Sequence, residues 1–203
     1  EQDDDDFEKL VLKNDNVDLA LRKFITEVES KTDDGQSTVK EYDREPNVVI
    51  EDVLNEYKDG KLITTANYEH SKTAVSVKVG DIVTYTIRVY NEGDVDGYVA
   101  EITDYLPQWL EFLPTDELNI QYLWGYKEEG NTRIIATEIT AKDNASGELL
   151  YNKEGEPTYR ENGKLLKAYD PDTMETLDYI DVKIRCKVDR KSTRLNSSHD
   201  QIS

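Results

Sequence analysis

Residues 81–114 read DIVTYTIRVYNEGDVDGYVAEITDYLPQWLEFLP, and this stretch decides the fold class of the chain. Between 81 and 91 apolar and polar residues alternate, which is the period expected of a half-buried strand. The apolar set is Val83, Tyr85, Ile87 and Val89. A turn rich in Gly and Asp follows at 91–97, and a second alternation ends at Pro107, which cannot continue a ladder. The stretch predicts antiparallel strands in a sheet packed on one face.

A single acidic residue, Asp104, interrupts the inward series of the second strand, which is Ala100, Ile102, Asp104 and Leu106. A second anomaly is Lys23, which shares its face with apolar residues of a strand expected at 17–28. Residues 19–24 fit a helical period as well, but Ile25, Thr26 and Val28 favour a strand. An unpaired charge is costly to bury. We therefore expect Lys23 and Asp104 to lie within hydrogen-bond reach if their strands are neighbours.

The remaining strands are less sharply defined, except for the last. Between 180 and 188 Ile180, Val182, Ile184, Cys186 and Val188 alternate with polar residues, which predicts Cys186 as an inward, structural thiol. Further strands are expected at 73–79, 134–140 and 147–150, with a strand and a hairpin inside 30–71. Trp124 is expected to pack at the edge of the sheet. The fold class predicted is all-β and antiparallel.

Composition narrows the classes of function. The chain has 44 acidic and 25 basic residues, a formal net charge of −19, which disfavours nucleic acid as a partner. No apolar run is long enough to span a membrane, and one cysteine excludes an intrachain disulfide. Motifs for nucleotide binding, zinc binding and nucleophilic catalysis are missing. We expect a non-enzymatic protein without cofactor or metal. Oxygen ligands for calcium at 91–96 are an alternative to a plain turn.

The chain resembles a known group of domains. The residues that carry the resemblance are the opening segment 18–26 (DLALRKFIT), Gly80, Asp81, Tyr85, Thr86, Asn91, the corner at 103–107 (TDYLP) and Leu110. They resemble the conserved-repeat and fimbrial isopeptide-forming domains of Gram-positive (firmicute) cell-surface proteins, over about residues 16–188. The resemblance implies an Ig-like β-sandwich of pilin or adhesin type, with insertions at 30–71 and 115–176. It also implies an extracellular location. The longer surface protein of which this chain would be a part, its parent, is then expected to be attached to the cell wall.

The same resemblance implies a covalent brace. In the family a lysine of the first strand condenses with an asparagine of the last strand, and a nearby acid assists. Lys23 matches the lysine by strand position and Asp104 matches the acid. Burial in an apolar setting favours the neutral amine and the neutral acid that this chemistry needs. The asparagine is expected on a strand beyond Val188, with Asn91 and Asn67 as substitutes inside the chain. The alternatives are an ordinary salt bridge, or a Lys23 side chain that snorkels to the sheet edge.

Both ends of the chain are expected to lie outside the domain. Residues 1–15 are acidic at Asp3 to Asp6 and are interpreted as a linker. Residues 189–199 (DRKSTRLNSSH) resemble a translated sequencing adapter, so 189–203 are interpreted as a non-native tail. The domain at 16–188 is then expected to be truncated before its last strand.

The function expected from these features is that of a structural stalk or adhesin module. Its partners would be neighbouring domains of the same surface protein and a host or matrix ligand, without membrane contact by this fragment. One alternative is a carbohydrate- or peptide-binding module in which Tyr122, Trp124 and Tyr126 form an aromatic platform. Another is an accessory domain of a surface enzyme.

Overall fold

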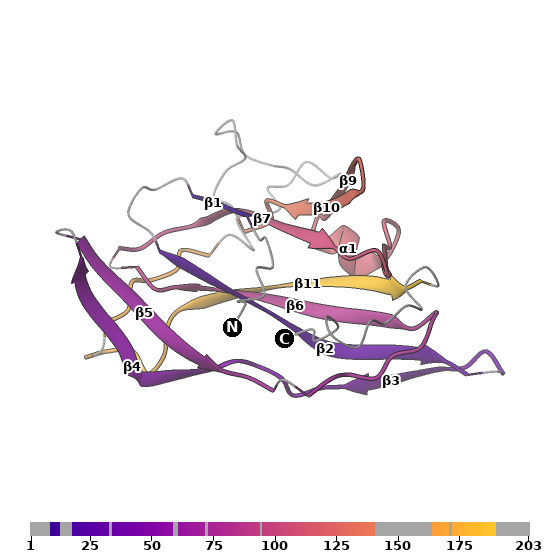
Figure 1. Ribbon diagram of the computed structural model, residues 1–203, viewed down its shortest axis with the longest axis horizontal. Helices are drawn as coiled ribbons and strands as arrows, with labels where there is room; N and C mark the ends of the chain where they lie inside the picture. Colours follow the sequence, from indigo (N-terminus) through magenta and orange to yellow (C-terminus); the bar gives the residue numbers. More distant parts are fainter. Residues whose placement is uncertain are drawn as a thin grey trace.

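The protein is mostly β, with antiparallel sheets packed against each other and one short helix (Figure 1). This architecture confirms the predicted all-β, antiparallel class. The computed structural model describes residues 9–12, 18–32, 34–58, 61–71, 73–93, 95–140, 164–170 and 172–189, and for 9–12 and 50–65 it describes the backbone alone. The strand predicted at 147–150 lies outside these residues.

The larger sheet has five strands in the order β3-β2-β6-β11-β8, and neighbouring strands run antiparallel. Its strands are β2 (Leu19–Lys31), β3 (Ser37–Glu41), β6 (Ile82–Asn91), β8 (Leu110–Phe112) and β11 (Tyr179–Val188). The alternating segments at 81–91 and 180–188 form β6 and β11, which pair over most of their length. β2 begins two residues later than expected and continues to Lys31, where β3 pairs with its second half.

The smaller packed sheet has four strands in the order β1-β7-β10-β9. They are β1 (Lys9–Leu12), β7 (Val99–Leu106), β9 (Gly125–Glu129) and β10 (Thr132–Thr137). β1 lies inside the segment interpreted as a linker, and this short stretch with three consecutive apolar residues pairs with β7. The helix α1 (Glu117–Gln121) begins after Asp116, whose carboxylate accepts from the amide of Leu118.

One apolar core lies between these two sheets, and it contains the residues that the alternation predicts. Val83, Ile87, Ile102 and Ile184 are fully buried there, with Tyr85, Val89 and Val182. Leu21 is partly buried and packs against the same cluster. Burial of each such side chain stabilises the fold by about 2 kcal/mol relative to exposure. Cys186 faces inward as predicted.

The outer face of the five-stranded sheet is covered as well, contrary to the prediction that the sheet packs on one face. A two-stranded ribbon, β4 (Asn47–Lys58) and β5 (Lys61–Glu69), contributes Ala66 to a second buried cluster with Tyr90 and Leu177. Figure 1 shows this ribbon extending beyond the sheets. β6 is buried on both faces, and its outward polar residues are covered by neighbouring side chains: Thr84 bonds to Glu27, Thr86 to Thr26, and Arg88 to Asp181 and Glu45.

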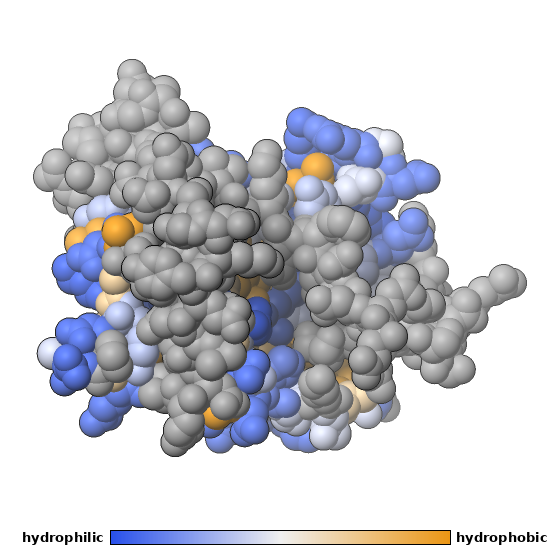
Figure 2. Space-filling view, turned by 60° about the vertical axis from the view of Figure 1, so that its left-hand side comes forward, coloured by the Kyte–Doolittle hydropathy of each residue, from blue (hydrophilic) through white to orange (hydrophobic). Residues whose placement is uncertain are grey.

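One further expectation differs from the structure. The sequence pattern predicts a strand at 73–79, but residues 73–78 have no ladder partner among the described residues. The segment inside 30–71 forms β3 and the antiparallel pair β4 and β5, in line with the strand and the hairpin expected there. On the face shown in Figure 2, the described surface is mostly hydrophilic, as the charge of the chain suggests, and apolar colour is confined to small patches.

Candidate functional site

Lys23 and Asp104, the two charged side chains that the alternation pattern places inward, are in contact. The Nζ atom of Lys23 lies 2.6 Å from Oδ2 of Asp104, and it donates a hydrogen bond to this oxygen. The Lys23 side chain is 12% exposed and that of Asp104 is 4% exposed. The other carboxylate oxygen, Oδ1, accepts from the amide of Tyr105 at 2.9 Å. The ion pair is thus shielded from water, and both oxygens of its acid are engaged.

The premise of neighbouring strands is wrong, although the contact itself is present. β2, which carries Lys23, pairs with β6 and β3, whereas β7, which carries Asp104, pairs with β1 and β10. The two residues therefore meet across the core, from opposite sheets. The alternation of residues along a strand identifies which side chains point inward, but it does not show which sheet the strand joins.

The surroundings of the pair are apolar and aromatic. The Lys23 ammonium lies 4.9 Å from the centre of the Tyr85 ring, a favourable cation–π distance. Cys186 is fully buried in the same core, and its charge interactions with Lys23 and Asp104 are appreciable. Burial raises the pKa of the Cys186 thiol to about 12, outweighing the opposing effect of the Lys23 charge. The thiol is therefore neutral at physiological pH, which agrees with a structural role for Cys186.

The backbone of β2 is open beside Lys23. β3 pairs only with Glu27–Lys31, so among the described strands nothing pairs with the outer edge of β2 from Leu19 to Ile25. An additional strand on this edge would lie next to Lys23. The site therefore combines an amine and an acid with a strand edge that has no partner among the described strands, where a third group can arrive.

The two asparagines considered as substitutes inside the chain, Asn91 and Asn67, lie away from this site. Asn91 is fully buried at the end of β6, where its amide nitrogen donates to the carbonyls of Val95 and Leu166 and its oxygen accepts from Gly93. It organises the turn, as its sequence position suggests. Asn67 is exposed on β5, in the separate two-stranded ribbon.

The other candidate groups have structural positions. Trp124 is buried, and its indole nitrogen donates to the carbonyl of Lys183 at 2.8 Å. Only Tyr126 of the three proposed platform residues is well exposed. Within the described ranges no three His, Cys, Asp or Glu side chains are grouped so that they could hold a metal ion. At the turn Asp96 instead pairs with Lys167, and Glu92 accepts from the Tyr68 hydroxyl.

An ion cluster that the sequence analysis missed lies on the outer face of the five-stranded sheet. Arg88 donates to both carboxylate oxygens of Asp181, at 2.7 and 2.8 Å, and to Glu45 at 3.0 Å. Its guanidinium also covers the Tyr179 ring at 3.9 Å. Burial opposes the charge, but the Asp181 carboxylate raises the pKa of Arg88 above its usual value. The sequence could have indicated this cluster through cross-strand pairing, because Arg88 and Asp181 lie opposite each other in the register of β6 and β11.

No family model, curated protein or solved structure matches this chain. Among the described residues no helix has the length and apolar character needed to cross a membrane.

Proposed function

We propose that this chain is a structural stalk or adhesin module of a bacterial cell-surface protein. It is extracellular and non-catalytic, with an Ig-like β-sandwich of the pilin or adhesin type. The observation that supports this most directly is the shielded contact between Lys23 and Asp104, which joins opposite sheets. The sequence resemblance described above supports the same assignment independently of the geometry.

The physical argument concerns why a charged pair is kept in an apolar core. A buried salt bridge often contributes no more stability than apolar residues of the same volume, because desolvation offsets the attraction. Stability alone therefore does not explain Lys23 and Asp104. An amine and a carboxyl held at 2.6 Å next to an open strand edge are, in contrast, the arrangement that amide condensation requires.

The proposed step joins Lys23 to an asparagine on an additional strand beside β2. Proton transfer from the Lys23 ammonium to Asp104 first gives a neutral amine and a neutral acid. The amine attacks the side-chain amide carbon, a C–N bond forms, and the bond to the amide nitrogen breaks. Asp104 donates its proton to the departing nitrogen, which leaves as ammonia, and takes up the proton that the new amide nitrogen loses. The result is a covalent link between strands, which would let a stalk module carry load without unfolding.

The test uses the parent surface protein, with the strand that follows Val188 in the resembled family. Mass spectrometry of the intact domain should show a loss of about 17 Da, one ammonia for each condensation. Lys23→Arg and Asp104→Ala should each abolish the loss. Lys31→Arg is the matched control, because Lys31 is an exposed lysine of the same strand. If the folded parent protein shows its full mass, without the loss of ammonia, the covalent role is contradicted. Lys23 and Asp104 are then an ordinary buried pair.

The alternative of a carbohydrate-binding platform has weaker support. Trp124 presents little of its ring to a ligand, because it is 7% exposed and its indole N–H is already bonded. Tyr126→Ala removes the one ring of the three that is exposed. Comparing glycan binding of this variant and the unmodified protein on an array would test whether the platform binds carbohydrate. Binding that is lost with this ring would favour the platform.

A further inference from the structure

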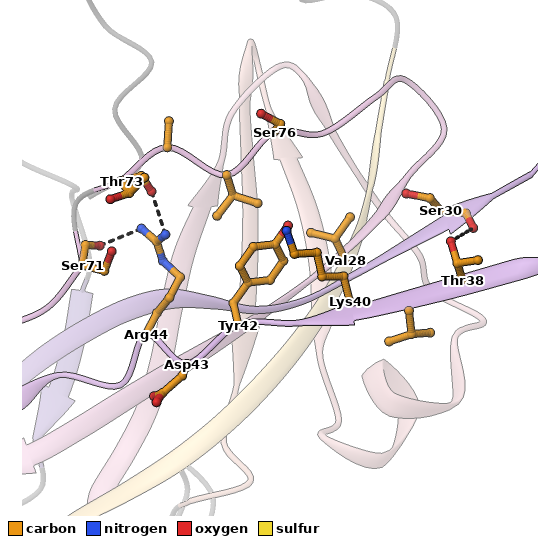
Figure 3. Close-up of a pocket in the computed structure, with 13 residues that line it drawn as sticks. Val28, Ser30, Thr38, Lys40, Tyr42, Asp43, Arg44, Ser71, Thr73 and Ser76 are labelled. Atoms are coloured by element: carbon orange, nitrogen blue, oxygen red, sulfur yellow. Dashed lines mark hydrogen bonds between the residues drawn. The ribbon is translucent and has the colours of Figure 1, made fainter.

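A second feature, on the side of the five-stranded sheet where β3 forms its edge, is an open groove of about 590 Å³. One wall is the inward face of β2 and β3 together with Tyr42 and Arg44, and the other is formed by Ser71 and residues 73–76 (Figure 3). Arg44 holds the two walls together by donating to the carbonyls of Ser71 and Thr73, at 2.7 and 2.6 Å.

Charge is sorted between the two faces of the β2–β3 ribbon. The face toward the groove carries Lys40 and Arg44, separated by Tyr42, and the Lys40 ammonium lies 4.8 Å from the centre of that ring. Asp43 points to the opposite side (Figure 3). The opposite face lines a different hollow, to which Glu27, Glu29, Glu41 and Glu45 contribute. The period of two in the strands separates the signs in this way.

The cations of the groove are not neutralised within the part of the chain that the structure describes. Neither Lys40 nor Arg44 takes part in an ion pair there, whereas Arg185 on the opposite face pairs with both Glu29 and Asp116. Uncompensated positive charge in a chain of net charge −19 is unexpected. It gives the groove a preference for a negatively charged occupant.

No strand in the described part of the chain pairs with the outer edge of β3, so its backbone can accept a further strand. The amide of Tyr42 donates to the carbonyl of Thr26 on β2. Because backbone groups alternate in direction along a strand, Lys40 also points its amide toward β2, and Val39 points its amide and carbonyl away, toward the open edge. Val39 itself is 56% exposed. Such an edge is a template for strand addition.

We propose that this groove binds an extended, acidic peptide segment of a partner protein. The segment adds as a strand to the free edge of β3, through the backbone groups of Val39 and Glu41. Its carboxylates lie near Lys40 and Arg44, and its small apolar side chains pack on Tyr42 and Val75, which line the groove. Specificity comes from charge, and affinity comes from the backbone ladder.

The probe is a blocked peptide of alternating valine and threonine flanked by glutamates, and the comparison is the same peptide flanked by lysines. Fluorescence anisotropy should show binding of the acidic peptide, weakened by added salt, and much weaker binding of the basic one. Lys40→Glu should weaken binding of the acidic peptide by about tenfold. Lys183→Glu is the matched control, because Lys183 lines the opposite hollow, and it should leave the affinity unchanged.

The backbone contribution is tested separately. Val39→Pro removes the outward amide without removing a bond to β2, so it should abolish binding while the circular dichroism spectrum stays unchanged. Methylating alternate amides of the peptide should abolish binding too, and this second test needs no change in the protein. Equal binding of both peptides, no binding of the acidic peptide, or binding that survives amide methylation would each overturn the proposal.

Discussion

Lys23 and Asp104 meet across the core at 2.6 Å, from opposite sheets of the protein. Their strands also carry apolar side chains that pack in this core, so the pair is a polar contact inside an otherwise apolar interface. Its two members are not equally shielded. Lys23 retains 12% exposure and Asp104 only 4%, so the lysine can still reach toward water when its partner is removed.

This asymmetry predicts unequal effects of single substitutions on stability. Lys23→Met leaves a buried carboxylate without its cation and should lower the free energy of unfolding by about 3 kcal/mol. Asp104→Asn should cost less, because Lys23 can snorkel and the oxygen of the introduced amide can still accept from the Tyr105 N–H. The double variant should recover part of the loss. Urea unfolding followed by circular dichroism measures all three, and additive losses would show that the residues do not interact.

The buried tryptophan gives a second prediction. Trp124→Phe leaves the Lys183 carbonyl without its indole donor and should lower the free energy of unfolding by about 1 to 3 kcal/mol, from the lost bond and the lost volume. Tyr126→Phe is the control, since it removes only a hydroxyl group, from a residue that is 43% exposed on the edge strand β9. It should change stability by less than about 0.5 kcal/mol. Equal effects of the two changes in urea unfolding would contradict a structural role for Trp124.

Much of this fold is predictable from local pattern, and the exceptions have a common physical cause. Alternation places Val83 and Ile184 in the core, and it identifies Lys23 and Asp104 as inward charges. It misses the burial of Arg88, because Glu45 and Tyr179, which cover its guanidinium, come from distant parts of the sequence. It also assigns a strand to 73–79, where the right local pattern exists without a neighbour to pair with among the described residues. Local pattern predicts which way a side chain points, whereas partners depend on the whole topology.

The C-terminal segment, which resembles a translated adapter, is predicted not to contribute to the stability of the fold. Removing residues 190–203 should leave the midpoint of thermal unfolding unchanged, because the adapter-like sequence has no reason to pack specifically. Asp189 is kept in this truncation, since its amide donates to the carbonyl of Trp109 at 2.8 Å. Differential scanning calorimetry of the two forms is the measurement. A midpoint that falls by several degrees would show that this segment belongs to the fold.

A buried acid at the base of the β4–β5 ribbon predicts how stability depends on pH. Glu92 is 8% exposed and accepts a hydrogen bond from the Tyr68 hydroxyl at 2.5 Å. Burial raises the pKa of Glu92 above its usual value of 4.5, and the Tyr68 hydrogen bond opposes that rise without cancelling it. The folded protein therefore holds this proton more tightly than the unfolded chain does. The resulting stabilisation is fully present below pH 4.5 and is lost as the pH rises through the folded-state pKa.

Glu92→Gln should remove this dependence, because a glutamine oxygen still accepts from Tyr68 and carries no charge to desolvate. At pH 7 the variant should unfold a few degrees higher than the unmodified protein, and the difference should vanish in acid, where Glu92 is protonated in both states. Thermal unfolding across this pH range, compared at constant ionic strength, measures the effect. Glu101→Gln is the control, since Glu101 lies on β7, away from the ribbon. A lower midpoint for Glu92→Gln at pH 7 would mean that the carboxylate charge stabilises the ribbon rather than opposing its burial.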